Sequence, residues 1–132
     1  MIQTIEREVM FTEQDVHTFL NNLGDNHTIY KNKENAREFG YEEIPLPPTM
    51  PFIAYRELHA PWKFIEPIIL RKQQCDYHQT MYVNRPYKVL LSLDKTTNRK
   101  PYTFVKQTLS IIDKNQKLCY SSVSHLVVGG IE

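Results

Sequence analysis

The chain has 132 residues, of which 41% are hydrophobic and 23% are charged, and its formal net charge is +1. These values fit one soluble globular domain, and we expect residues 1–132 to form it. No apolar run approaches the ~20 residues of a transmembrane helix, and the N-terminus MIQTIEREVM lacks the apolar centre of a signal peptide. A membrane span is therefore excluded at this stage, and a cytoplasmic location is predicted.

The charge is unevenly distributed along the chain. Residues 1–66 carry 6 basic against 11 acidic residues, a net −5, while residues 67–132 carry 10 against 4, a net +6. This asymmetry fits ordinary solvated faces, but it also fits a basic side that meets a phosphate-bearing ligand or an acidic partner. No basic cluster is dense enough along the sequence to predict nucleic-acid binding.

The sequence predicts no metal site and no disulfide. Cys75 and Cys119 lie far apart without a CxxC motif, so we expect two reduced, packed thiols. The histidines have no spacing typical of metal ligands; they stand at positions 17, 27, 59, 78 and 125.

The first predicted element is a helix over residues 12–23. Thr12 followed by Asp15 is a capping-box pattern, with Asp in place of the usual Glu, and Phe11 and Val16 can form a hydrophobic staple. Apolar residues then recur at helical spacing as far as Leu23. Gly24 suits the left-handed residue that ends a helix.

Irregular structure and short helices follow. Asn32 can cap a second helix over 32–39, and the loop 24–30 joins it to the first helix. The prolines of IPLPPTMP (44–51) forbid a regular helix there. Thr49 can cap a third helix in the 49–60 region, with Pro51 tolerated in its first turn.

The second half reads as strands. Segments 75–84, 88–96, 102–112 and 118–128 are rich in β-branched and aromatic residues, and loops are predicted at 96–100 and 113–116. A run of antiparallel strands after a run of helices predicts an α+β fold with helix packed on one sheet face.

Several of these segments together resemble one known family. Phe11-Thr12-Glu13-Gln14-Asp15-Val16, Gly24-Asp25, Tyr30, Ala36, Gly40-Tyr41 and Pro47-Pro48-Thr49-Met50 resemble the opening of MaoC-like dehydratase and hydratase domains, which carry a GDxNPxH fingerprint. Residues 77–86 are similar to the strand-and-proline segment of that family, and the N-terminal dehydratase-like domain is the closer match. The resemblance covers nearly the whole chain. It implies a hot-dog fold, a curved antiparallel sheet wrapped around a central helix.

The resemblance also implies a reaction. The family hydrates trans-2-enoyl thioesters or dehydrates (3R)-hydroxyacyl thioesters, with an Asp and a His five residues apart sharing one water. A backbone N–H at a helix N-terminus would polarise the thioester carbonyl. Carried over residue by residue, the family Asp falls on Asp25 and the family His falls on Tyr30.

Each catalytic candidate has a competing interpretation. Tyr30 is a poor base at neutral pH, because the phenol pKa is near ~10. His27 offers a substitute imidazole two residues after Asp25, or it is a loop side chain facing solvent. Asp25 is either the family acid or a turn-forming residue bonded to its own loop.

The expected substrate contacts follow from the same resemblance. Pro47, Pro48, Thr49 and Met50 would wall the acyl tunnel, or serve as scaffold only. Arg85 and Lys88 would hold pantetheine or nucleotide phosphates, or remain solvated charges. Trp62 is interpreted as a core or dimer-interface residue.

The predicted function is a (3R)-hydroxyacyl-thioester dehydratase or enoyl-thioester hydratase, a hydro-lyase acting without cofactor on acyl-CoA or acyl carrier protein thioesters. The alternative is a non-catalytic acyl-binding subunit whose partner brings the Asp/His pair. A hot-dog thioesterase is a third, weaker interpretation. Because hot-dog domains pair side by side, we expect a homodimer or a heterodimer with a catalytic hot-dog subunit.

Overall fold

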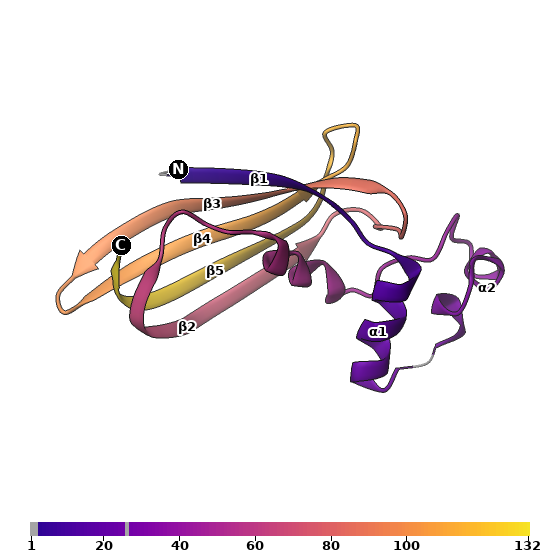
Figure 1. The fold of residues 1–132 in the computed structure, drawn as a ribbon, viewed down its shortest axis with the longest axis horizontal. Helices are drawn as coiled ribbons and strands as arrows, with labels where there is room; N and C mark the ends of the chain where they lie inside the picture. The colour runs from indigo at the N-terminus through magenta and orange to yellow at the C-terminus, as the bar shows by residue number, and fades with distance from the viewer. Residues whose placement is uncertain (1–2, 26) are drawn as a thin grey trace.

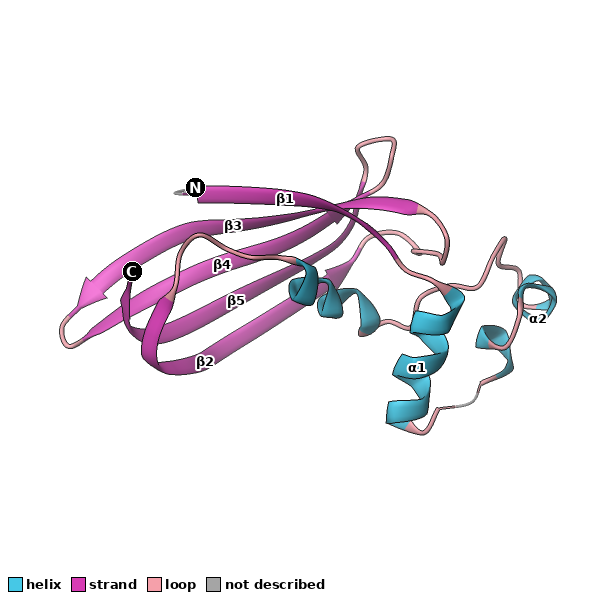
Figure 2. Ribbon diagram, in the orientation of Figure 1, coloured by secondary structure: helices cyan, strands magenta, loops and turns pink. Residues whose placement is uncertain are grey.

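The computed structural model describes residues 3–25 and 27–132; Asn26, part of the predicted loop 24–30, lies outside the described residues. Figures 1 and 2 show one sheet with short helices at one end and against one face. The elements, in chain order, are β1 Gln3–Met10, α1 Glu13–Leu23, η1 Thr28–Tyr30, α2 Lys33–Glu38, η2 Met50–Glu57, β2 Phe64–Tyr77, β3 Pro86–Arg99, β4 Tyr102–Ile112 and β5 Leu118–Ile131. No helix among the described residues has the length and apolar character needed to cross a membrane.

The five strands form a single antiparallel sheet in the order β1-β3-β4-β5-β2. The three strands β3, β4 and β5 are consecutive in the chain and form a meander. The two edge strands precede this meander in the chain, and β1 pairs with β3 while β2 pairs with β5. The predicted α+β class with an antiparallel sheet is confirmed.

The first helix has the predicted ends. The Thr12 hydroxyl accepts from the Asp15 backbone N–H at 3.0 Å, and Asp15 accepts from the Thr12 N–H at 2.9 Å, which completes the capping box. Gly24 has a φ of 73°, the left-handed conformation that glycine adopts without strain. The second helix is capped by Asn32, as predicted.

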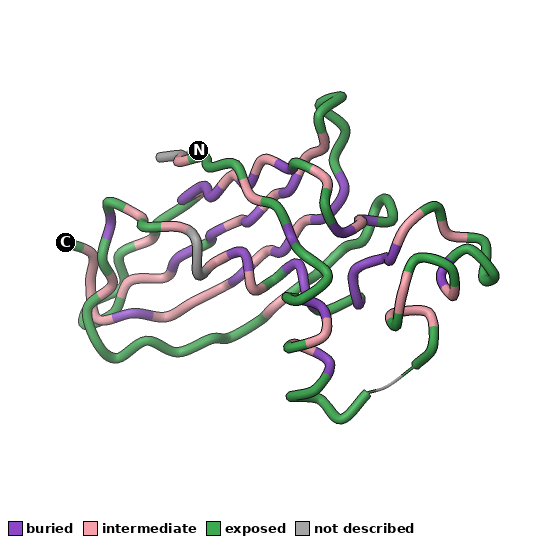
Figure 3. Tube along the Cα trace, turned by 45° about the vertical axis from the view of Figure 1, so that its right-hand side comes forward, coloured by how far each residue is buried: buried purple, intermediate pink, exposed green. Residues whose placement is uncertain are grey.

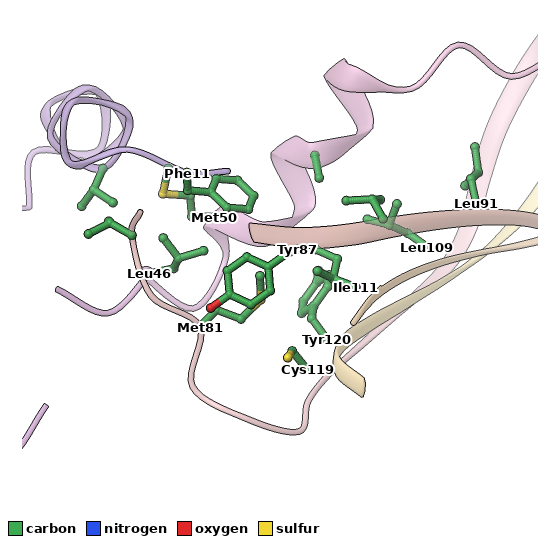
Figure 4. Packing of buried hydrophobic residues seen from close by; sticks show 14 of the residues in the cluster. Phe11, Leu46, Met50, Met81, Tyr87, Leu91, Leu109, Ile111, Cys119 and Tyr120 are labelled. Carbon is green, nitrogen blue, oxygen red and sulfur yellow. The ribbon is translucent and has the colours of Figure 1, made fainter. Parts of the chain in front are cut away.

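The core lies between η2 and one face of the sheet, called here the inner face. Alternate residues of β3 and β4, such as Val89, Leu91 and Leu109, are buried on this face. Met50 and Ala54 of η2 belong to the same buried cluster. Figure 4 shows how these side chains pack, with Met50 beside Phe11 and Met81 beside Tyr87. The buried cluster therefore joins the sheet, η2 and the start of α1.

Polar side chains also occupy the inner face. Trp62 is buried, and its Nε1–H donates to Gln107 Oε1 at 2.8 Å. Ser124 donates to Gln73 Oε1 at 2.8 Å, and the Gln73 side-chain amide donates to Ser122. Hydrogen bonding satisfies these buried groups, so the inner face near β2 is polar without a large desolvation cost.

The edge strand β2 is exposed over almost all of its length (green in Figure 3). Its exposed apolar side chains include Ile68, Ile69 and Leu70, which retain 53%, 51% and 54% of their accessible surface. An exposed apolar edge strand presents unpaired backbone groups that favour pairing with another strand.

Several predicted boundaries were wrong. The strand predicted at 75–84 is Phe64–Tyr77, and the part after Tyr77 is mostly a loop. Met81 and Val83 of this loop are buried and bond the proline-rich segment, since Leu46 N–H donates to the Met81 carbonyl and Val83 N–H to the Ile44 carbonyl. Their apolar character reflects this packing, not a long strand.

Four other expectations needed correction. The strand β1 was not predicted, because the first half was interpreted as helical and irregular. The third helix is a 3-10 helix, and Thr49 makes no side-chain cap bond to it. The loop predicted at 96–100 is shorter, since β3 continues to Arg99 and the turn lies at Lys100 and Pro101. Both thiols are free, but only Cys119 is packed, because Cys75 is exposed.

Candidate active site

The three predicted catalytic residues lie in the short connection between α1 and α2. The left-handed Gly24 turns the chain out of α1, and the 3-10 turn η1 follows directly. Asp25, His27 and Tyr30 all line one open hollow with a volume of about 350 Å³. The fold therefore gathers side chains that are five residues apart around a single space.

Asp25 is exposed and stabilises its own loop. Its Oδ1 accepts from the backbone N–H of His27 at 3.0 Å, an Asx turn of the kind that short acidic side chains form readily. Both interpretations of Asp25 are therefore compatible with its position, because one carboxylate oxygen holds the turn and the residue also lines the hollow.

His27 caps η1 with its ring. Its Nδ1 accepts from the Ile29 backbone N–H at 3.2 Å, and its ring packs edge-on against Phe39 at 5.5 Å between centroids. Because Nδ1 accepts this bond, the neutral ring carries its proton on Nε2. In this geometry the outward nitrogen of His27 is a donor and not a base.

Tyr30 lies part-buried at the end of η1. Burial, followed by the negative charge of Asp25 and then by Tyr41, raises the pKa of the Tyr30 phenol. The phenol therefore stays protonated at neutral pH, where it can donate a hydrogen bond or a proton but cannot accept one from a carbon acid.

His17 is a site residue that the sequence interpretation missed. It stands on α1, and its Nε2–H donates to the Tyr30 backbone carbonyl at 2.9 Å, so it fastens the loop to the helix. It lines the hollow together with Leu20 and Asn21, which lie three and four residues further along the helix. That helical spacing is the signal that would have placed His17 beside the loop.

The predicted substrate contacts lie elsewhere. Pro47 and Met50 are buried and Pro48 and Thr49 are exposed, and none of the four lines the hollow around Asp25. Their segment leads into η2 and contributes to the core.

Arg85 and Lys88 lie at two further hollows. Arg85 lines a polar hollow of about 730 Å³, donates to Glu42 at 3.1 Å and stacks on the Tyr82 ring at 4.3 Å. Lys88 lies 4.0 Å from Glu6 at a hollow of about 230 Å³. Carboxylates therefore already neighbour both cations.

In the part of the chain that the structure describes, no three His, Cys, Asp or Glu side chains lie close enough together to hold a metal ion. The polar residues around the hollow include a carboxylate, a phenol and two imidazoles that form hydrogen bonds with the backbone, together with Asn21, Thr28 and Lys31. This set is suited to proton transfer and hydrogen bonding.

The fold is similar to that of several solved hydratases and dehydratases. The C-terminally truncated HadBC (3R-hydroxyacyl-ACP dehydratase) complex from Mycobacterium tuberculosis matches at 13% identity and a TM-score of 0.74, over 96% of this chain and 97% of that chain. The (R)-hydratase from A. caviae involved in PHA biosynthesis matches at 13% identity and a TM-score of 0.75, over 94% of this chain and 92% of that chain. A MaoC-like dehydratase from Rhodospirillum rubrum matches at 12% identity and a TM-score of 0.76, over 96% of this chain and 90% of that chain. At these identities the likeness shows the fold, which is the predicted hot-dog fold.

Sequence comparison supplies the family. No curated protein matches the chain in sequence. Residues 3–115 match the family described as FAS1-like, dehydratase domain region, which covers most of the chain and agrees with the predicted MaoC-like resemblance. The chain therefore belongs to the FAS1-like dehydratase domain region family.

Proposed function

We propose that the chain acts on acyl thioesters in the dehydration of (3R)-hydroxyacyl groups or the reverse hydration of enoyl groups. The observation that carries this proposal is the convergence of Asp25 and Tyr30, which stand where the family has its Asp and His, on one hollow. The family assignment and the similar solved structures, which include hydratases and dehydratases, support the same reaction class. The reaction needs only acid and base groups beside a polarised carbonyl.

Within this hollow the proton-transfer roles are unequal. Dehydration requires a base that takes the α-proton and an acid that protonates the departing hydroxyl, which leaves as water. The Asp25 carboxylate can accept a proton, while the protonated Tyr30 phenol can donate one. Donation by Tyr30 would form a phenolate that burial and the Asp25 charge both disfavour. Turnover by the chain alone should therefore be slow.

A second candidate function follows from this imbalance. The chain would be the acyl-binding half of a two-subunit dehydratase whose other subunit supplies the Asp/His pair. The hydrogen bond that His27 Nδ1 accepts from the Ile29 backbone favours this candidate, because it occupies one ring nitrogen of the nearest substitute base and leaves the proton on the other. The exposed apolar edge of β2 offers a surface on which a second hot-dog subunit, identical or different, would continue the sheet.

The ligand in either case is an acyl thioester of coenzyme A or of a carrier protein. Pro47, Pro48, Thr49 and Met50 stay proposed tunnel residues, and Arg85 and Lys88 stay proposed phosphate contacts, for the assembled protein. A cytoplasmic location likewise stays a prediction of the sequence.

The test is hydration of crotonyl-CoA by the wild type and by Asp25→Asn, Tyr30→His and Tyr30→Phe. If the chain is an enzyme, Asp25→Asn lowers turnover by at least ~10²-fold, the lower end for an acid/base group, and Tyr30→His raises it. If the chain is the binding half, the wild type is inactive alone and active with a partner subunit, and Asp25→Asn leaves that activity unchanged. Wild-type activity that Asp25→Asn does not alter, in the chain alone, would remove the proposed catalytic role.

A further inference from the structure

The sheet face opposite η2, called here the outer face, carries a row of basic side chains. Lys95 of β3 stands directly opposite Lys106 of β4, Lys106 opposite His125 of β5, and His125 opposite Lys72 of β2. Directly opposed residues of an antiparallel pair point to the same face, so four basic side chains cross four strands side by side. With strands about 4.8 Å apart, the row spans roughly 14 Å.

Two arginines flank this row. The guanidinium carbons of Arg71 and Arg99 lie 5.0 Å and 5.3 Å from the centroid of the Phe104 ring. These contacts hold both guanidinium groups against one aromatic side chain, which reduces their freedom before any ligand arrives. Phe104 lies on the same face as Lys106, two residues along β4.

Carboxylates do not neutralise the row. Within the described residues, no carboxylate forms an ion pair with Arg71, Lys72, Lys95, Arg99 or Lys106. Of the acidic residues on the same face, Asp94 lies beside Lys95 and Asp76 lies further along β2, while Glu6 and Glu8 of β1 stand opposite Leu90 and Lys88 of β3. Asp94 already accepts from the Ser92 hydroxyl at 2.7 Å and from the Thr108 hydroxyl at 2.5 Å. Directly opposed like charges destabilise a sheet, so the Lys95–Lys106 pair lowers the stability of the protein when no ligand is bound.

The surface is also hollowed there. Arg71, Lys95, Arg99, Lys106 and His125 line a depression of about 350 Å³ with Phe104 among them. This volume falls in the lower range of small-ligand sites, roughly 300–1,000 Å³. Guanidinium forks bind phosphate oxygens in pairs, and ammonium groups add point charges.

We propose that this outer-face hollow binds a small soluble ligand that carries two or more phosphate groups, such as a nucleoside diphosphate. The lysine row and the two arginines supply more positive charge than one phosphate can neutralise, and bound phosphates would relieve the repulsion along the row. The site lies on the face opposite η2 and shares no residue with the hollow around Asp25. It is therefore distinct from the proposed thioester site.

The experiment is calorimetric titration of the full chain with inorganic pyrophosphate and with ADP, at constant ionic strength. The variants are Lys106→Gln and Lys95→Gln, and the matched control is Lys63→Gln, an exposed lysine outside the hollow. We expect binding of both probes and about tenfold weaker binding in each of the two variants, as is typical for loss of one charged hydrogen-bond partner. Lys63→Gln should bind as the wild type does. Both row variants should fold, because each removes a like-charge contact.

Three results would overturn the proposal. If the wild type and both row variants bound pyrophosphate and ADP equally tightly, the binding would reflect general charge attraction and not a site at the hollow. Orthophosphate binding as tightly as pyrophosphate would remove the requirement for two phosphates. Binding of a poly-glutamate peptide that depends on Lys106, with no binding of pyrophosphate or ADP, would assign the face to an acidic protein partner.

Discussion

Replacement of Ile69 by lysine on the exposed edge of β2 should weaken self-association about 10²-fold. A two-fold axis that pairs β2 with its own copy in antiparallel fashion must run perpendicular to the sheet, so one residue stands opposite itself. Ile69 lies midway between Glu66 and Lys72 on β2. In the register that places Ile69 opposite its own copy, Glu66 of each strand therefore stands opposite Lys72 of the other, which gives two complementary charge pairs. Ile69→Lys would then place two ammonium groups side by side at the centre of the interface.

The magnitude follows from the exposed surface. Ile68, Ile69 and Leu70 retain 53%, 51% and 54% exposure. Full burial of such a side chain contributes about 1.5–3 kcal/mol, so covering the exposed half contributes about 1 kcal/mol each. Two protomers would gain about 6 kcal/mol from these residues, before the entropic cost of association. Loss of both Ile69 contacts, with added charge repulsion, should weaken the dimer by about 3 kcal/mol, or about 10²-fold in Kd.

The assay is sedimentation velocity over a range of micromolar concentrations. Leu23→Lys is the matched control, since Leu23 is 62% exposed at the end of α1, away from β2. The control should associate as the wild type does, and circular dichroism should report the same fold for all three proteins. A monomeric wild type, or a folded Ile69→Lys protein that still associates normally, would refute the reasoning.

Two further predictions concern stability. Gly129→Ala should destabilise the protein by more than about 2 kcal/mol in urea unfolding, because the added Cβ would lie 2.2 Å from the Glu66 backbone oxygen; an unchanged midpoint would contradict this close approach. Burial raises the pKa of the Cys119 thiol from 9.0 to about 11, so its neutral form contributes stability that is complete below pH 9 and is lost as the pH rises towards 11. Urea unfolding between these pH values should show that loss, and it should be smaller in Cys119→Ala; an equal loss in both proteins would refute the assignment.

The sequence predicts well those elements whose signals are local. The capping residues Thr12 and Asn32 mark the starts of α1 and α2 in the sequence. The strand β4 has its predicted range because its apolar residues Val105, Leu109 and Ile111 follow the two-residue period of a strand with one buried face. The strands β1 and β2 lacked such a signal. Glu6, Arg7 and Glu8 are all exposed on β1, and β2 is exposed on both faces, so neither edge strand shows the alternation of a half-buried strand.

The candidate site divides in the same way. Asp25, His27 and Tyr30 were predicted because they lie within one short segment that resembles a family fingerprint. The role of His17 depends on a bond to a carbonyl thirteen residues away, which local patterns do not specify. The outer-face row could not be predicted, because its members belong to four strands and meet only through the register of the sheet.

The strand order also bears on how the chain folds as it leaves the ribosome. Both edge strands are synthesised before the strands that they pair with. Phe64 of β2 pairs with Ile131 of β5, which is synthesised 67 residues later. At about 5–20 residues per second, the apolar stretch of β2 would remain unpaired for roughly 3–13 seconds. The nascent chain would therefore expose an aggregation-prone segment until β3, β4 and β5 have emerged. Chaperone binding during synthesis, or early docking of a second subunit, would protect this stretch in the interval.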